Sequence, residues 1–461
     1  MKHQYNIKDK YSIEAYAKRL LDKSLSDVLS PEDINAIRAE LNNKSNKGKF
    51  GSIIEKYFFG IEPGNKSAPD FEEAGVELKT SPLKENYRSK ERLVLGMIDY
   101  CSIVNETWKG SHFLKKNLWL LLMFYMHDDN KILLELIIKI IGLWSYSEED
   151  FLIIKRDWEL IQQKIIDGKA HELSEGDTLY LGACTKASTS ADRRKQPNSN
   201  IPAKPRAFAL KQTYVNIIIE KMREEMADFH HTQIKYGRII KNVKELKNKN
   251  GLEEITLSKL KPYIGLSDEQ IQRRLRVKFK KKPKNVYSIL TYRMLGVEKP
   301  CVEEFEKANI ELKTIRLKNN NLPKEDMSFP AFKYTEIVKE DWDNCELKTE
   351  YLEKKFLFVV FKYNDKQKLI FQGAFFWNMP YRDMLEVQKV WKETQKRIKY
   401  GNCMSLPKKS ENKICHVRPH ATNKNDTYPT PNGGKAVKKC FWLNTQYIRD
   451  QVLANNMLIK P

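Results

Sequence analysis

Four side chains in the first part of the sequence have the types and the order of a metal-dependent catalytic site. They are three carboxylates and one lysine: Glu55, Asp70, Glu77 and Lys79. Residues 76–80 alternate apolar and polar side chains, as a half-buried β-strand does, and residues two apart in a strand point to the same face. We therefore expect Glu77 and Lys79 to project together, while the side chain between them enters the core.

This combination of groups suits the hydrolysis of a phosphodiester. Carboxylate oxygens bind Mg²⁺, which keeps several of its waters and accepts phosphate oxygens. A bound metal stabilises the charge that develops on the phosphate and lowers the pKa of a bound water, and a neighbouring lysine orients that water. The sequence predicts Asp70, Glu77 and Glu55 as metal ligands and Lys79 as the catalytic lysine. An exposed strand edge has the same Glu-x-Lys pattern, so this structural alternative stays open here.

The elements that must position these groups indicate a mixed α/β fold. Apolar residues recur at helical spacing in residues 12–41, 50–59 and 150–167, which predicts helices there. The segments 75–80 and 117–125 have the composition of strands. Helices and strands in this order predict an α/β domain with a mixed sheet flanked by helices.

The chain also contains a long internal repeat. Residues 70–84 and 304–318 are identical at nine of 15 positions. Further pairs of segments follow in the same order and at a nearly constant offset: 51–60 with 287–296, 184–189 with 418–423, and 208–217 with 441–450. The shared order predicts a duplicated domain.

The repeat divides the chain into two predicted copies and a join. The first copy is predicted at residues 1–225 and the second at 252–461. Residues 226–251 between them are polar and rich in Lys and Asn, which is typical of a linker.

The second copy does not repeat the whole catalytic set. Its matching positions are Thr291, Glu304, Glu311 and Lys313. The threonine removes one carboxylate, and a glutamate in place of the aspartate moves its oxygens by about one methylene, which metal sites tolerate poorly. We therefore expect the second copy to be catalytically inactive.

Composition favours a polyanionic partner. The chain has 82 Lys and Arg against 60 Asp and Glu, a net charge of +22, which makes nucleic acid the first expectation. A basic protein from a lysine-using genome and an anionic membrane surface are the alternatives. The run 271–284 has eight basic and no acidic residues, which favours phosphate contacts over a solvated helix face.

Several classes of protein are not expected. Seven cysteines without a CxxC pair argue against structural zinc and a disulfide framework. The apolar stretches are too short or too interrupted to span a bilayer, and the N-terminus lacks the apolar core of a signal peptide. We expect a cytoplasmic protein.

Four segments together resemble a known family. Residues 51–60 and 63–82 resemble the catalytic segment of the MutH mismatch-repair nicking endonuclease and its restriction-enzyme relatives, and residues 169–189 and 204–215 resemble the downstream part. The duplicated length is similar to that of the Sau-type restriction endonucleases. The resemblance implies two tandem restriction-endonuclease-like (PD-(D/E)xK, MutH-like) domains. It also implies an Mg²⁺-dependent type II enzyme that cuts double-stranded DNA at 5′-GATC-3′, before the G.

The resemblance also implies roles for particular residues. Glu55, Asp70, Glu77 and Lys79 match the catalytic positions, and a further lysine of the family falls at Lys115 or Lys116. The positions implied to contact DNA are Lys115, Lys116, Lys186, Tyr214, Arg418, His420 and Tyr447.

Each of these DNA-binding assignments has a structural alternative. Lys186 and Arg418 are alternatively surface charges, and Tyr214 is alternatively a core aromatic at the start of a helix. Cys184 stands where relatives have the arginine of an Arg-Pro-Lys motif, whereas Arg418 restores it in the second copy. His416 and His420 are more simply explained as satisfied surface histidines than as metal ligands.

One active site per chain has a consequence at a symmetric sequence. GATC has two scissile phosphates, so the enzyme must dimerise on DNA, rebind, or recruit a second molecule. The resemblance implies that the second copy binds another GATC as an effector, with or without looping the DNA. The alternatives are a MutH-like strand nickase, against which the duplicated chain argues, and a non-catalytic GATC-binding module.

Overall fold

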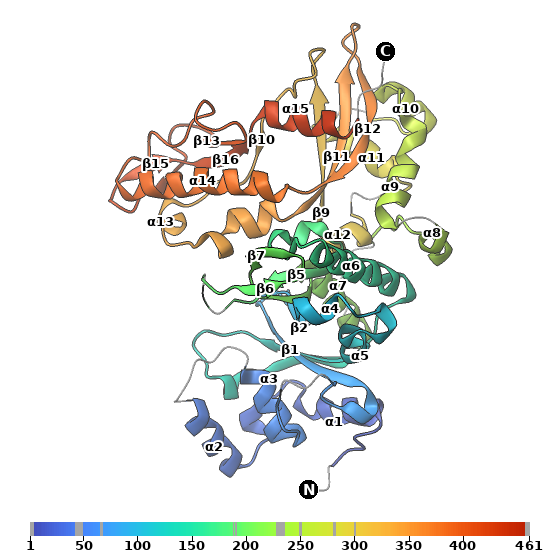
Figure 1. The fold of residues 1–461 in the computed structure, drawn as a ribbon, viewed down its shortest axis with the longest axis vertical. Coiled ribbons are helices and arrows are strands. Elements are labelled where there is room, and N and C mark those ends of the chain that lie inside the picture. The colour runs from blue at the N-terminus through green and yellow to red at the C-terminus, as the bar shows by residue number, and fades with distance from the viewer. Residues whose placement is uncertain are drawn as a thin grey trace. The chain divides into compact units, whose positions relative to one another are not determined.

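A computed structural model of the chain describes residues 4–41, 49–64, 68–187, 189, 191–226, 236–248, 251–279, 283–298 and 301–456. The chain divides into two compact units (Figure 1). Unit 1 comprises Met1–Leu173, Thr178–Ile234 and Glu306–Ala308, and unit 2 comprises Ser174–Asp177, Lys235–Phe305 and Asn309–Pro461. The main division, between residues 234 and 235, falls inside the segment 226–251.

The first sheet of unit 1 is the mixed sheet that carries Glu77 and Lys79. Its strands are β1 (Val76–Leu83), β3 (Trp119–Met126) and β4 (Ile138–Trp144), in the order β1-β3-β4. β1 is parallel to β3, and β3 is antiparallel to β4. The strands predicted at 75–80 and 117–125 are confirmed, with β1 extending three residues further than expected.

Short helices at the N-terminus pack on this sheet. They are α1 (Lys10–Ala17), α2 (Pro31–Leu41) and α3 (Lys49–Ile53), and their apolar residues join those of β1, β3 and β4 in one core cluster. The helical prediction for 12–41 holds only in part, because an extended segment around Ser24 separates α1 from α2.

The second sheet of unit 1 is antiparallel, and its first strand lies between β1 and β3 in the chain. It has the order β2-β8-β5, with β2 at Leu93–Met97, β8 at Arg206–Leu210 and β5 at Leu181–Thr185. The hairpin β6 (Arg194–Gln196) and β7 (Ser199–Ala203) connects β5 to β8.

Two longer helices complete unit 1. Helix α6 (Glu148–Ile166) confirms the helix predicted at 150–167. Its N-cap Ser147 accepts a hydrogen bond from the Asp150 amide, at 3.2 Å, and its apolar residues are buried at intervals of three and four, as a one-sided helix requires. Helix α7 (Gln212–Glu225) follows β8.

Unit 2 has the same connectivity in its sheets. Its mixed sheet has the order β12-β11-β9, with β9 (Ile310–Leu317) parallel to β11 (Lys355–Tyr363) and β11 antiparallel to β12 (Leu369–Trp377). Its antiparallel sheet has the order β10-β16-β13, and a second hairpin lies between β13 and β16. The strands are β10 (Met327–Ser328), β13 (Cys415–Pro419), β14 (Thr427–Pro429), β15 (Lys435–Val437) and β16 (Lys439–Leu443).

The helices of unit 2 that correspond to α6 and α7 are α14 (Tyr381–Lys399) and α15 (Thr445–Ala454). The remaining helices of the chain are α4 (Tyr100–Ile103), α5 (His112–Asn117), α8 (Val243–Asn248), α9 (Leu252–Leu260), α10 (Asp268–Arg274), α11 (Val286–Met294), α12 (Glu303–Ala308) and α13 (Tyr334–Ile337). The basic run 271–284 begins in α10, and its residues 280–282 lie outside the described part.

Individual contacts recur in the two units at the offset of the sequence repeat. The side-chain amide of Gln162 donates to the backbone carbonyls of Ile103 and Glu106, at 2.6 and 2.8 Å. The side-chain amide of Gln395 donates in the same way to two backbone carbonyls of unit 2, at 2.5 and 3.0 Å. The rings of Trp108 and Trp158 lie 5.7 Å apart, and the matching tryptophan pair of unit 2 lies 5.5 Å apart.

Two residues predicted to contact DNA lie in this repeated core instead. The Tyr214 side chain has no exposed surface, and Tyr447 is 7% exposed. Their hydroxyls donate to Asp150 and Asp383 respectively, both at 2.7 Å. The DNA-binding prediction for both tyrosines is wrong. Each lies in the first turn of its helix, α7 or α15, and that turn faces the aspartate near the start of α6 or α14.

No disulfide joins the seven cysteines in the described part of the chain. A search of the described helices finds none with both the length and the apolar character needed to cross a bilayer.

The tyrosines provide a test of this placement. Replacing Tyr214 with Phe removes a hydrogen bond to a charged group that is only 3% exposed, which should lower the free energy of unfolding by about 1.5–3 kcal/mol. Tyr447→Phe should have a smaller effect, about 0.5–1.5 kcal/mol, because Asp383 is half-buried and water can replace the hydroxyl. Urea unfolding measures both. Unchanged stability combined with weaker DNA binding would restore the surface role predicted from sequence.

Candidate active site

Glu77 and Lys79 lie together on β1, as their spacing predicts. Lys79 Nζ is 2.6 Å from Glu77 Oε1. The Glu77 side chain is 2% exposed and that of Lys79 is 20% exposed. A charged pair at this depth differs from the exposed strand edge that the pattern alone left open, because it is largely removed from solvent.

Asp70 is tied to the start of the same strand by two hydrogen bonds. Its Oδ2 accepts from the backbone amide of Leu78, at 2.9 Å, and its own amide donates to Glu77 Oε2, at 3.2 Å. These bonds hold the Asp70 and Glu77 carboxylates beside each other, although the two residues are seven positions apart in sequence.

Glu55 reaches this group from a helix with an unusual turn. The helix predicted at 50–59 is split into α3 and a π-helical turn, η3 (Ile54–Phe59), that begins just before Glu55. Such turns are rare and occur frequently at functional sites. A Cβ on Gly51 would lie 3.3 Å from Thr80 Oγ1 and 3.9 Å from Glu55 Oε1, so the glycine allows the helix to approach β1 closely here.

Burial and neighbouring carboxylates raise the pKa of Glu55 and of Glu77. The pKa of Glu55 is raised to about 7, first by burial and then by the charges of Asp70 and Glu77, against the opposing effect of two lysines. Burial also raises the pKa of Glu77, with Asp70 adding to the effect and Lys79 opposing it. Negative charge is therefore concentrated in a partly desolvated place, where a cation would stabilise the ionised forms.

A second lysine contacts this group from another element. Lys116, near the end of α5, lies 3.4 Å from Glu77 Oε1 and its side chain is 20% exposed. The neighbouring Lys115 is exposed. Of the two lysines that the sequence left undecided, Lys116 is therefore the one beside the carboxylates.

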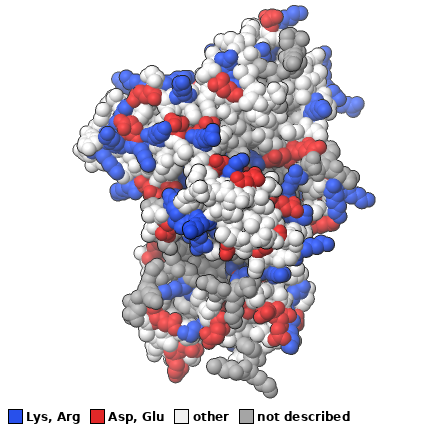
Figure 2. Space-filling model, viewed as in Figure 1, with Lys and Arg blue, Asp and Glu red and all other residues white. Residues whose placement is uncertain are grey.

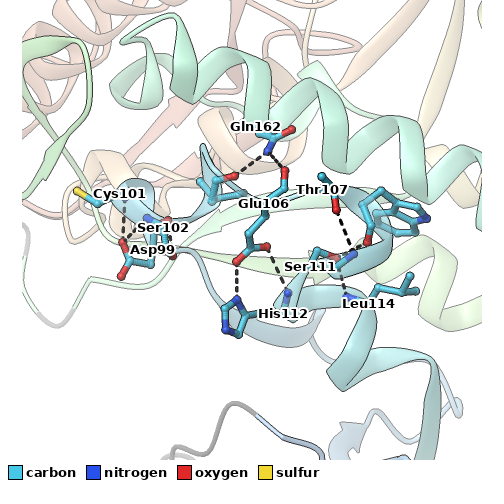
Figure 3. A network of polar contacts seen from close by, with 12 residues as sticks. Asp99, Cys101, Ser102, Glu106, Thr107, Ser111, His112, Leu114 and Gln162 are labelled. Atoms are coloured by element: carbon cyan, nitrogen blue, oxygen red, sulfur yellow. Dashed lines mark hydrogen bonds and ion pairs between the residues drawn. The ribbon is translucent and has the colours of Figure 1, made fainter.

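The segment before α5 is fixed by a network of polar contacts (Figure 3). Ser111 caps the helix by accepting from the Leu114 amide, at 3.1 Å. The Glu106 carboxylate accepts from the His112 amide, at 3.2 Å, and pairs with the His112 ring, at 2.5 Å. Gln162 of α6 holds the Glu106 carbonyl. Sequence reasoning missed Glu106, His112 and Gln162. The recurrence of Glu and Gln at matching positions of the repeat was the available signal.

A cleft of about 710 Å³ opens beside Lys79. Five basic side chains are among the residues that line it: Lys79, Lys90, Arg92, Lys131 and Lys186. Lys186, predicted to contact DNA, is exposed here. His127 also lines the cleft, contacts Lys90, and lies 2.9 Å from Asp129. No motif in the sequence points to Lys90, Arg92, Lys131 or His127.

The donor set suits a hard divalent cation that keeps part of its water. Within the described residues, no three or more His, Cys, Asp and Glu side chains gather closely enough to hold a metal ion by themselves. Mg²⁺ needs only one or two carboxylates in addition to waters and phosphate oxygens. The adjacent carboxylates of Asp70 and Glu77 meet that requirement, and Glu55 adds negative charge next to them.

The matching positions in unit 2 do not gather in the same way. Glu311 has two lysine partners, Lys313 at 2.6 Å and Lys354 at 3.1 Å. Burial raises its pKa, but the two lysines outweigh burial and leave the pKa below its usual value. Glu304 is 3% exposed, and its Oε1 accepts from the amides of residues 239 and 240. Thr291 is fully buried and donates to the Tyr287 carbonyl, at 2.8 Å.

The predicted DNA-reading residues of unit 2 that remain at the surface lie on β13 and just after it. Arg418 and His420 are exposed, and both contact the ring of Trp442. His416, in contrast, is 3% exposed and bonds Asn444, at 2.5 Å. His416 therefore has a side-chain partner, as the structural alternative expects, but it is buried and not at the surface.

Comparisons with known proteins agree with this arrangement. The model of the family described as DNA mismatch repair enzyme MutH matches residues 59–157, in unit 1, and 299–390, which except for Glu306–Ala308 belong to unit 2. The type II restriction enzyme Sau3AI of Staphylococcus aureus is 36% identical over 94% of this chain and 92% of its own length. The DNA mismatch repair protein MutH of Yersinia enterocolitica is 28% identical over 46% of this chain and 93% of its own length. That of Vibrio vulnificus is 27% identical over 39% and 80%.

A mixed α/β unit with a buried Glu-x-Lys strand and two MutH-type segments defines a nuclease of the MutH class. The chain belongs to the MutH-like endonuclease family that includes the type II restriction enzyme Sau3AI. It is a type II site-specific deoxyribonuclease.

The two neighbouring lysines of α5 allow a matched test. Lys116→Ala should reduce the rate of DNA cleavage by about 10-fold or more, because the contact with Glu77 is lost. Lys115→Ala removes the same charge from the exposed neighbouring position and should change the rate by no more than about 2-fold at moderate salt. Single-turnover cleavage rates distinguish the two. Equal losses in both variants would show that general attraction for DNA, not the contact with Glu77, explains the effect.

Proposed function

We propose that this enzyme cuts double-stranded DNA at 5′-GATC-3′, on the 5′ side of the G, using Mg²⁺, and that unit 1 contains its active site. The observation that carries the proposal is the cluster of three interacting carboxylates and two lysines in unit 1, in a chain similar to Sau3AI along nearly its whole length. The alternative of a non-catalytic DNA-binding module is disfavoured, because such a module has no need for mutually repelling carboxylates around a buried glutamate.

The residues of unit 1 have distinct roles in this proposal. Asp70 and Glu77 hold Mg²⁺, with Glu55 beside them. The metal, when bound, supplies positive charge for the phosphate and acidifies a water. Lys79, hydrogen-bonded to Glu77, orients the attacking water and offsets the negative charge that develops on the phosphate. Lys116 opposes the rise in the pKa of Glu77 by placing a second positive charge beside it.

The basic side chains of the cleft suit contacts with the DNA backbone. Lys90, Arg92, Lys131 and Lys186 line the same cleft as Lys79, so a strand whose phosphates they neutralise would pass the catalytic lysine. Figure 2 shows further Lys and Arg side chains on both units, interspersed with Asp and Glu. Lys186 can in addition contact a guanine edge.

We further propose that the two units are tandem copies of one MutH-like domain, at residues 1–225 and 252–461, joined by the linker 226–251. The shared sheet connectivity and the recurring contacts support this duplication. Unit 2 would be catalytically inactive, because its matching groups leave a single glutamate between two lysines. It would bind a second GATC as an effector, with DNA looping or dimerisation on DNA bringing two sites together.

A strand-nicking endonuclease is the second candidate. One specific observation favours it: within the described residues, only unit 1 has the complete carboxylate cluster, so one chain has one set of groups for two strands. The product distinguishes the candidates, since a nickase leaves relaxed circles where a restriction enzyme leaves linear fragments.

The matching glutamates of the two units test the catalytic assignment. On plasmid DNA with several GATC sites, the wild type in Mg²⁺ should give discrete fragments that end at GATC, and EDTA should abolish them. Glu77→Ala should reduce cleavage by at least about 100-fold. Glu311→Ala is the control in unit 2 and should retain cleavage. Loss of cleavage in Glu311→Ala alone would place the active site in the other unit.

The effector role of unit 2 predicts a dependence on the number of sites. A plasmid with two GATC sites should be cut faster than one with a single site, and an added short GATC duplex should accelerate cleavage of the single-site plasmid. Steady-state rates over a range of enzyme concentrations provide the measurement. Equal rates on both substrates throughout that range would contradict the effector role.

A further inference from the structure

An arginine of unit 2 is held against an aromatic ring at the protein surface. The Arg418 guanidinium lies 3.8 Å from the centre of the Trp442 ring, a distance suited to a cation–π contact. The His420 ring approaches the same tryptophan edge-on, at 5.4 Å. The Arg418 side chain remains 45% exposed, so it is oriented by the protein and still accessible from outside.

A buried carboxylate holds the same guanidinium from a second direction. Asp326 Oδ2 lies 3.3 Å from Arg418 Nη1, and the Asp326 side chain is only 6% exposed. Its other oxygen, Oδ1, accepts from Lys409, at 2.6 Å, and from the Thr445 amide, at 2.7 Å. Burial raises the pKa of Asp326, but these bonds outweigh burial and leave the pKa below its usual value, so the anchor stays charged.

Unit 1 has no such arrangement at the matching place in its sheet. In unit 2, Arg418 pairs with Cys440 and Trp442 pairs with His416. The corresponding pairs of unit 1 are Cys184 with Ala207 and Gly182 with Ala209. Cysteine and alanine therefore stand where unit 2 has the arginine and the aromatic ring.

We propose that Asp326 and Trp442 are positioning residues that present Arg418 to a guanine edge, and that unit 2 is therefore the more selective DNA-reading unit of the chain. This proposal rests on the proposed binding of GATC by unit 2. A guanidinium discriminates bases by donating two parallel hydrogen bonds to O6 and N7 of guanine, and it does so only if its plane is fixed. The ring fixes the plane and the carboxylate fixes the direction, while only one guanidinium nitrogen is used for the anchor.

The test separates orientation from general charge. The asparagine of Asp326→Asn keeps a carbonyl oxygen that accepts from Thr445 and Lys409. Its NH₂ group lies opposite Arg418 and cannot hold the guanidinium, because both groups are hydrogen-bond donors. The full-length chain is titrated, without divalent metal, with a GATC duplex and with a scrambled duplex of the same composition. Affinity for GATC should fall by about 10-fold, whereas affinity for scrambled DNA should stay the same or rise, because a negative charge is lost. A purely structural defect would weaken both.

The matched control is Glu325→Gln. Glu325 precedes Asp326, is 67% exposed and pairs with Arg316, at 3.1 Å. This variant removes the same charge without touching Arg418, so the ratio of the two affinities should not change. Arg418→Ala should lose selectivity to the same degree as Asp326→Asn, and the double variant should lose no more than either single variant.

Three outcomes would overturn a claim, and they can be told apart. Wild-type protein that does not prefer GATC would contradict the proposed function itself. A preference for GATC over scrambled DNA that is lost in Arg418→Ala but kept in Asp326→Asn would reject the positioning role of Asp326 and leave GATC binding by unit 2 standing. An equal loss of affinity for both duplexes in Asp326→Asn, accompanied by a lower midpoint of urea unfolding, would show that Asp326 acts only through stability.

Discussion

The proposed active site depends on the parallel pairing of β1 with β3. In a parallel pair the starts of both strands lie side by side, and Val76 pairs with Trp119. This register brings Lys116, which comes just before β3, to Glu77 near the start of β1. The carboxylates and lysines therefore come from segments that are distant in sequence, and the register of this one strand pair brings them together. Unit 2 has the same pairing and the same result, since Lys354 precedes β11 and contacts Glu311.

The same scaffold produces opposite electrostatics in the two units. In unit 1 three carboxylates share a partly desolvated place, and the pKa values of Glu55 and Glu77 are raised. In unit 2 one carboxylate lies between two lysines, and the pKa of Glu311 is lowered. Excess negative charge needs a cation from outside, whereas a carboxylate already neutralised by lysines does not. The surface of unit 2 instead presents an oriented arginine, where the matching strand pair of unit 1 has cysteine and alanine.

Recurrence in the two units does not by itself indicate function. Tyr214 and Tyr447 recur because each fills the core and satisfies a carboxylate on the neighbouring long helix. Burial of a phenol without a partner is unfavourable, so the hydroxyl and the carboxylate are kept as a pair. The proposed difference in function between the units rests instead on groups that differ, such as Glu55 against Thr291 and Cys184 against Arg418.

The sequence by itself determined the repeat, the strands that carry Glu77 and Lys79, the helix at 150–167 and the family, because each is a pattern of neighbouring residues or of segments in order. It could not distinguish Lys116 from Lys115, place Tyr214 and Tyr447 inside, divide the helix at 50–59 into an α and a π turn, or find Asp326 behind Arg418. Those facts depend on which faces meet when the sheets form, and strand register and the burial that follows from it were decided only by the tertiary structure.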